Sequence, residues 1–270
     1  MPGMASSVIG TCALCLKENT GLCESHLFPK AFYRWIQRSM NGVKNSNPVI
    51  ITAKQATTKS FQISEHLLCP ECENLLRLGG EEWVLKNGYR GGSGFALQSA
   101  LSKARPLEVL EKASIIDGRT VPGVDVGQLV YFGVSVFWRA SARKWDALDH
   151  SIELSLGPYR EKLRRFLLRQ EAFPEQAVLI VNVSAAPPRL LGATFPYSNR
   201  VNGIWQHRFS LPGMAFWLHL GQFKDPLPAL CAAHSGIICY SRTLDENYER
   251  EMLALMQTAK PSAALSGGHR

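Results

Sequence analysis

The sequence predicts an α+β fold in which a small cysteine-rich module at the N-terminus is joined to a larger mixed α/β region. Two Cys-x-x-Cys pairs bracket the first 80 residues, and such pairs are typical of metal-bound modules. Further along the chain, apolar runs of strand length alternate with longer amphipathic segments of helical period. We therefore divide the chain into a module over residues 1–80 and a mixed region over residues 81–270.

The composition is that of an ordinary globular protein of 270 residues, with 46% hydrophobic and 19% charged residues. These values argue against a disordered or fibrous chain. Since no apolar run reaches about 18 residues, the sequence predicts no membrane-spanning helix and no membrane partner. The N-terminus lacks the basic and apolar regions of a secretory signal, and the seven cysteines are an odd number. Both features favour a reducing cytoplasm.

The N-terminal module is expected to contain two short helices and two short strands. Pro29 suits the first turn of a helix, and apolar residues recur at helical spacing after it. Gly79 and Gly80 are expected to end the second helix. The predicted elements, in order, are a helix over 29–40, strands over 48–52 and 60–63, and a helix over 71–78.

The mixed region is expected to begin with a loop, because residues 88–94 are rich in glycine. They lack the Lys-Ser/Thr pair of a phosphate-binding P-loop, which disfavours a phosphate site there. Patterns of period 3.6 predict helices, and short apolar runs predict strands. The expected helices cover 126–147, 158–170 and 244–257, and the expected strands cover 177–183, 214–220 and 237–240.

The two cysteine pairs predict a structural zinc site with four thiolate ligands: Cys12, Cys15, Cys69 and Cys72. Zinc prefers four soft ligands in a tetrahedron, and a Cys-x-x-Cys turn supplies two of them. The first pair would form a knuckle, and the second would lie where a strand meets a helix. A redox pair is the alternative, but it should follow a strand of a βαβ unit, which neither pair does. Cys23 fits the ligand spacing less well and is expected to be a buried thiol.

The residues around these pairs resemble a known enzyme family. The first pair is followed by Glu24-Ser-His-Leu-Phe-Pro-Lys30, and the second, Cys69-Pro-Glu-Cys72, is followed at once by Glu73. This arrangement resembles the HNH endonucleases with a zinc-stabilised treble-clef, or ββα-metal, core. It looks closest to the bacterial variant written Glu-Ser-His-x-x-Pro-Lys. The resemblance covers residues 12–78 and implies a treble-clef zinc module at the N-terminus.

In that family the histidine of the motif activates water, and a divalent ion stabilises the charge on the phosphate. The resemblance therefore makes His26 the candidate base and Glu73 a candidate ligand for Mg²⁺ or Mn²⁺. The match is partial, because Ser25 stands where typical members have an acidic ligand, and Glu24 is one position out of register. As alternatives, His26 packs in the core or binds zinc, and Glu73 is an acid at a helix N-terminus.

Basic residues indicate where a polyanion would bind. The formal net charge is +8, which favours such partners. Lys30, Arg34 and Arg38 are spaced by four, so they share one face of the first predicted helix and could contact phosphates. The helix predicted over 158–170 is also basic. For both helices a solvated face remains the alternative.

Two functions remain open from the sequence. The first is a metal-dependent nuclease of the HNH type acting on DNA or RNA, for which the resemblance implies a setting such as phage defence. The second is a non-catalytic zinc module that binds nucleic acid or a protein. A third, weaker hypothesis adds a protein partner, such as an ATPase, that licenses cleavage. The residues after position 80 match no enzyme motif that we can name.

Overall fold

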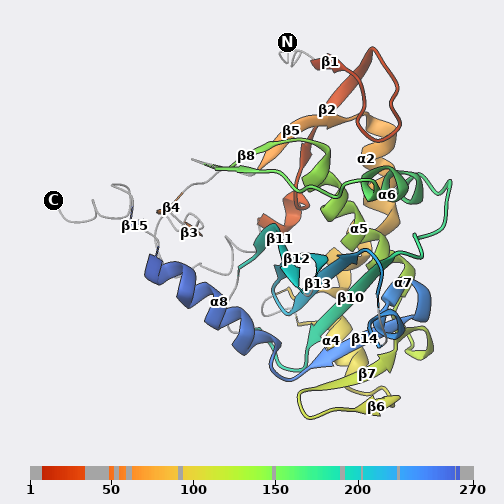
Figure 1. Cartoon of the computed structure of the whole chain (residues 1–270), viewed down its shortest axis with the longest axis vertical. Helices are drawn as coiled ribbons and strands as arrows, with labels where there is room; N and C mark the ends of the chain where they lie inside the picture. Colours follow the sequence, from red (N-terminus) through yellow and green to blue (C-terminus); the bar gives the residue numbers. More distant parts are fainter. Residues whose placement is uncertain are drawn as a thin grey trace.

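We analysed a computed structural model of the chain. The structure describes residues 8–33, 49–51, 55–58, 63–90, 94–147, 150–188, 192–201, 203–223, 226–258 and 260–261. It is a mixed α/β fold, with the cysteine-rich module at one end and a seven-stranded sheet at the other (Figure 1).

The module is built on a three-stranded antiparallel sheet of β1 (Val8–Gly10), β2 (Thr20–His26) and β5 (Ser64–Leu68), with β2 in the middle. Helix α2 (Pro70–Leu76) follows β5 after a single residue, Cys69. The second cysteine pair therefore lies at a junction of strand and helix, as predicted. The helix expected from residue 29 begins at Lys30 and is described as far as Tyr33, and the rest of it lies outside the described residues.

The prediction that Gly79 and Gly80 end the second helix is wrong. The chain continues through a π-helical turn, Arg77–Glu81, into α3 (Glu82–Asn87). A Cβ on Gly79 would collide with the Tyr131 ring, and one on Gly80 would lie 2.5 Å from the Gln128 carbonyl oxygen. The two glycines therefore allow a close approach to a neighbouring helix. The boundary expected between residues 80 and 81 lies inside this helical run.

The strand expected over 48–52 is present as β3 (Val49–Ile51), which pairs with β4 (Gln55–Thr58), and β15 (Lys260–Pro261) pairs with β4. The strand expected over 60–63 is tested only at Ile63, because residues 60–62 lie outside the described part of the chain. Ile63 is outside any strand, and β5 begins one residue later.

Strands between residues 108 and 241 form a seven-stranded sheet of order β11-β12-β13-β10-β14-β7-β6. Its predicted strands are present as β10 (Ala177–Ser184), β13 (Met214–Leu220) and β14 (Ile237–Ser241). The other four were not predicted from the sequence: β6 (Glu108–Val109), β7 (Ala113–Asp117), β11 (Thr194–Val201) and β12 (Ile204–Leu211). Most of these four mix polar and apolar residues, so their runs are weak strand signals.

Helix α5 (Val126–Ala142) is the centre of the fold and is buried continuously from Leu129 to Ser141. It ends five residues before the predicted end, and the chain enters the hairpin of β8 (Trp145–Ala147) and β9 (His150–Ile152). The remaining helices are α4 (Ala96–Leu101), α6 (Tyr159–Leu167), α7 (Ala232–Ser235) and α8 (Leu244–Thr258). Short 3₁₀ turns cover Gly118–Thr120 and Leu227–Leu230.

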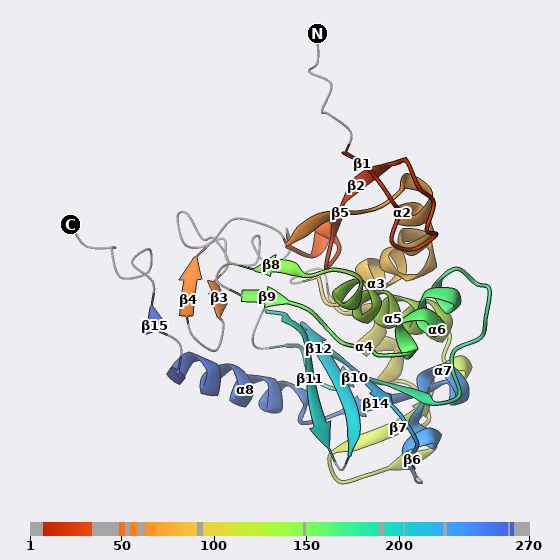
Figure 2. The same ribbon diagram turned by 45° about the horizontal axis from the view of Figure 1, so that its top comes forward.

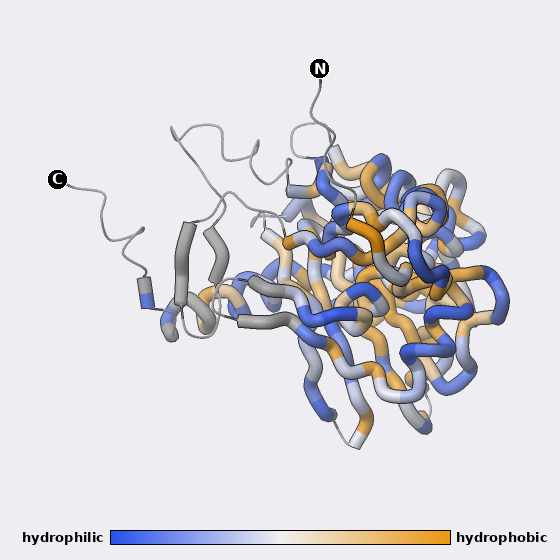
Figure 3. The backbone as a smooth tube through the Cα atoms, turned by 90° about the horizontal axis from the view of Figure 1, so that it is seen from above, coloured by the Kyte–Doolittle hydropathy of each residue, from blue (hydrophilic) through white to orange (hydrophobic). Residues whose placement is uncertain are grey.

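One side of α5 packs on the sheet and another on the π-helical turn, so the helix lies between the module and the sheet (Figure 2). Phe137 of α5 lies 4.9 Å from Phe209 of β12, measured between ring centroids. Phe28 of the module packs on the same Phe209 ring at 5.8 Å. The hydrophobic segments meet in the interior of the described chain (Figure 3). Module and sheet therefore share one core.

Candidate metal centre

A tight turn positions the first cysteine pair. The Leu16 amide donates to the Cys12 carbonyl at 2.9 Å, and the Cys12 amide donates to the Lys17 carbonyl at 2.9 Å. Leu16 adopts a left-handed backbone conformation, with φ of 63°, which lets the chain reverse within a few residues. The Ala13 amide also donates to the Leu67 carbonyl of β5, so the turn is fixed to the strand that leads into the second pair.

The start of α2 positions the second pair. Cys69 is the N-cap residue, Pro70 occupies the first turn, and Cys72 lies one turn further along the helix. The Cys69 amide donates to the Cys12 sulfur at 3.3 Å, and such donors stabilise a thiolate. The helix N-terminus adds a partial positive charge beside the sulfurs.

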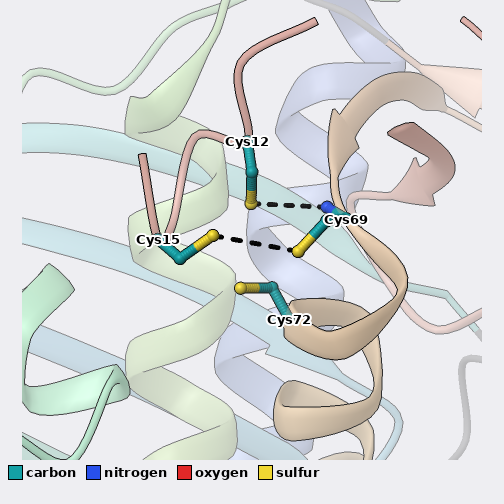
Figure 4. A group of neighbouring side chains, drawn as sticks. All are labelled: Cys12, Cys15, Cys69 and Cys72. Atoms are coloured by element: carbon teal, nitrogen blue, oxygen red, sulfur yellow. Dashed lines mark hydrogen bonds between the residues drawn. The ribbon is translucent and has the colours of Figure 1, made fainter. Parts of the chain in front are cut away.

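The four sulfurs face one another across a small space (Figure 4). All lie within 4.8 Å of one another, and the Cys15 and Cys69 sulfurs are 3.8 Å apart. A tetrahedral site with bonds of about 2.3 Å requires sulfurs about 3.8 Å apart. Cys12, Cys69 and Cys72 are buried. The four predicted ligands therefore form a group that could hold one metal ion, and Cys23 lies outside it.

Close packing of these thiols separates their pKa values. A hydrogen bond from Cys72 lowers the pKa of Cys12 to about 4, and the same interaction raises the pKa of Cys72. Burial raises the pKa of Cys69 to about 12. One thiolate is thus stabilised by its neighbours, while further ionisation is opposed by the negative charge already present. A cation among the four sulfurs would remove this opposition.

Helix α6 supports the turn from the other side. Arg164 donates from Nη1 to the carbonyl of Leu14, between the two cysteines of the first pair, at 2.6 Å. Other basic residues of this helix also have partners within the protein: Arg160 bonds to Ala142, Arg165 to Glu161 and Glu171, and Lys162 to Gln176. These contacts favour a structural role for α6 over the nucleic-acid contact that the sequence left open.

His26 is the last residue of β2, and it is half-buried opposite Ser64 of β5. Ser25 is 1% exposed, and its hydroxyl accepts a hydrogen bond from the Leu68 amide at 3.2 Å. Ser25 therefore has a structural role at the position where the family has an acid. Its neighbour Glu24 is exposed and accepts a hydrogen bond from the Ser64 hydroxyl at 2.8 Å.

Glu73 has a partner that the sequence did not reveal. The side chain of Arg139, on α5, is 2% exposed and its Nη2 lies 3.8 Å from Glu73 Oε2 and 2.5 Å from Glu81 Oε1. Burial opposes the charge of Arg139, but the two carboxylates raise its pKa. Glu73 Oε1 is buried without a hydrogen-bond partner. A cation on Glu73 would lie beside a fixed positive charge, which disfavours Glu73 as a ligand for Mg²⁺ or Mn²⁺.

The proposed phosphate contacts are described only in part. Lys30 is exposed at the start of its helix, close to His26 in the chain. Arg34 and Arg38 lie outside the described residues, so the basic face of that helix stays a prediction. Arg139 and Glu81 could not be found from the sequence, because their only signal was a charge within an apolar or glycine-rich run.

No helix in the described part of the chain is long and apolar enough to cross a membrane. In comparisons with known proteins, no family model, no curated protein and no solved structure matches the chain.

Proposed function

We propose that this protein is a zinc-stabilised, metal-dependent nuclease of the HNH type that hydrolyses phosphodiester bonds, with DNA as the first candidate substrate. The grouping of the four cysteine sulfurs carries the proposal. It holds the Cys12–Cys15 turn against the start of α2, directly beside the strand pair whose first strand ends at His26. A turn, an antiparallel strand pair and a helix, joined by four ligands, are the parts of a treble clef.

Zinc is the metal that this donor set fits best. Structural zinc typically takes four thiolates in a tetrahedron and has no open position for substrate. The four cysteines are buried or half-buried, and their sulfurs lie within 4.8 Å of one another. The zinc would therefore hold the fold, and the chemistry would belong to side chains beside it.

His26 is the candidate general base. It is half-buried at the end of β2, so water and a phosphate group can reach it, and imidazole is the side chain that most often acts as a general base. In this role His26 takes a proton from the attacking water, and Lys30 attracts the phosphate. A divalent ion would supply the charge that stabilises the reacting phosphate.

The ion pair of Glu73 favours a second candidate function, a zinc module that binds nucleic acid or protein without cleaving it. Since the Glu73 carboxylate forms an ion pair with Arg139, the residue at the family's closing-ligand position already has a partner within the fold. A nuclease would need its ion held elsewhere.

Incubation of supercoiled plasmid and of single-stranded RNA with the purified protein and Mg²⁺ or Mn²⁺ separates the two functions. The nuclease proposal predicts cleavage that falls at least about 100-fold in His26→Ala, with zinc content and unfolding temperature unchanged. His234→Gln is the matched control, because His234 contacts Pro174 and Phe173 in another part of the fold. Binding without cleavage by the wild-type protein would favour the non-catalytic module.

A further inference from the structure

Strands β2 and β5 bring a carboxylate and two imidazoles onto one face of the sheet. Glu24 pairs with His66 across the strands, and His26 pairs with Ser64. Paired residues point to the same side of a sheet, and so do residues two apart along a strand. Glu24, His26, Ser64 and His66 therefore share a face, although 40 residues of sequence separate the two groups.

An irregularity in the pairing sets this arrangement. The register shifts between Cys23, which pairs with Leu68, and Glu24, which pairs with His66. The extra residue, Leu67, belongs to β5, so the shift places His66 opposite Glu24. Side chains alternate along β2, so Ser25 points inward and is buried, whereas Glu24 is exposed. The Glu-Ser-His order thus places its first and third residues outward and its second in the core.

Glu24, His26, Ser64 and His66 form a polar cluster that solvent reaches and whose members interact with one another. Glu24 and His66 are exposed, and His26 is half-buried. The Ser64 hydroxyl holds the Glu24 carboxylate at 2.8 Å. This hydrogen bond, together with the nearby His26, Lys30 and His66, lowers the pKa of Glu24. The carboxylate is thus ionised and oriented beside two nitrogen donors.

The opposite face offers no equivalent set. Glu65, the neighbour of His66, lies 3.5 Å from Arg143 at the end of α5. Ser25 accepts a hydrogen bond from the Leu68 amide. The acid on this face is therefore paired with a cation, whereas Glu24 faces two imidazoles.

We propose that Glu24, His26 and His66 form a site for one divalent transition-metal ion, separate from the four cysteines. Residues two apart on a strand have Cα atoms roughly 6.7 Å apart, and facing residues have Cβ atoms about 5 Å apart. Both spacings allow two side chains to reach one ion. Two imidazoles and one carboxylate suit Mn²⁺, Fe²⁺ or Co²⁺ better than Mg²⁺.

Binding would reorient exposed side chains. Among the described residues, the four cysteines are the group whose donor atoms already lie within 4.8 Å of one another. The triad would close on the ion by rotation of Glu24 and His66 at the surface, and the ion would replace the Ser64 hydroxyl at Glu24. Its remaining positions would be open to water or a phosphate oxygen.

This inference deepens the proposed nuclease function, because it moves the second ion from Glu73 to the face of His26. At that site His26 would bind the ion and would not act as the base named in the proposed function, and a water molecule would accept the proton of the attacking water instead. The binding test does not need activity, so the two proposals can fail separately.

Titration of tag-free, zinc-loaded protein with Mn²⁺, followed by the electron paramagnetic resonance of free Mn²⁺, tests the site. We expect one Mn²⁺ per chain, with affinity reduced at least about tenfold in Glu24→Gln and in His66→Ala. Glu65→Gln, on the opposite face, and Glu73→Gln should bind Mn²⁺ as the wild type does. Zinc content and circular dichroism establish that each variant is folded.

Absence of Mn²⁺ binding, or binding that Glu24→Gln and His66→Ala leave unchanged, overturns the inference. Loss of binding in Glu73→Gln alone would return the ion to the closing position of the motif. Mn²⁺ binding with the expected pattern but without cleavage of DNA or RNA would sink the nuclease proposal and leave the metal site standing.

Discussion

At the scale of single residues, Arg139 is a charged side chain buried in the core. Its side chain is 2% exposed between two carboxylates, and its Nε has no hydrogen-bond partner. The Trp145 indole donates to its backbone carbonyl at 2.8 Å. An arginine in the interior is tolerated only with paired charges, since desolvation of an unpaired charge costs several kcal/mol. Arg139 therefore connects α5 to the helix that carries Cys72 and Glu73.

We expect Arg139→Leu to lower the free energy of unfolding by about 3–5 kcal/mol, because it leaves Glu73 and Glu81 without their cation. Arg143→Leu is the matched control. Arg143 is half-exposed in its pair with Glu65, so its loss should cost less than about 1 kcal/mol. Urea denaturation of both variants makes the comparison, and equal effects would contradict the assignment of Arg139 as the buried link.

At the scale of elements, the π-helical turn Arg77–Glu81 determines how the module meets α5. The backbone of Gly80 lies against the backbone of α5, where the Gln128 carbonyl and the Phe132 amide would be 2.5 and 2.7 Å from a Cβ. Backbone atoms cannot move aside as the end of a side chain can. Gly79 and Gly80 thus allow close packing against α5 within a continuous helical run.

We expect Gly80→Ala to destabilise the protein by about 1–3 kcal/mol or more through overpacking. Gly127→Ala, in the first turn of α5, is the control. A Cβ there meets only the Asp125 side chain, at 3.3 Å, and alanine favours a helix by up to about 1 kcal/mol. Because the Asp125 carboxylate would have to shift slightly while it accepts from Gln128, Gly127→Ala should change the unfolding temperature much less than Gly80→Ala. A neutral Gly80→Ala would argue against the close approach.

At the scale of the whole molecule, the four grouped cysteines are part of a single core. Buried residues form one continuous cluster from Cys12 to Cys239. Arg164 of α6 contacts the turn of the first cysteine pair, and Phe28 packs on the sheet. A substitution at the four cysteines should therefore also destabilise the sheet, since the elements that carry the cysteines and the sheet both pack on α5.

We expect elemental analysis to find about one zinc per chain, and Cys69→Ser to lose it. Since metal binding supplies folding energy, the loss should reach at least about 3 kcal/mol, or roughly 10 °C in Tm. Module and sheet should still unfold in one transition. Cys23→Ser is the control, because Cys23 lies outside the sulfur group, and it should keep its zinc. Freshly purified, reduced protein without metal would refute the zinc assignment.

The sequence by itself determined the features that depend on local pattern. The Cys-x-x-Cys spacings predicted the four grouped thiols, and the periodicity predicted α5, α6, β10 and β13 within a few residues. Each of these signals lies within one short segment, where a turn or a repeat of side chains fixes the backbone.

Only the tertiary structure decided the rest, because contacts between distant segments leave no local signal. The glycines at 79 and 80 continue a helix, since α5 packs against them. Glu73 lies beside Arg139, which is 66 positions away and inside an apolar run. The pairing of Glu24 with His66 depends on a shift in register between two strands. The packing of α5 and β5 thus decided that Glu73 lies beside a cation and that Glu24 lies beside the histidines.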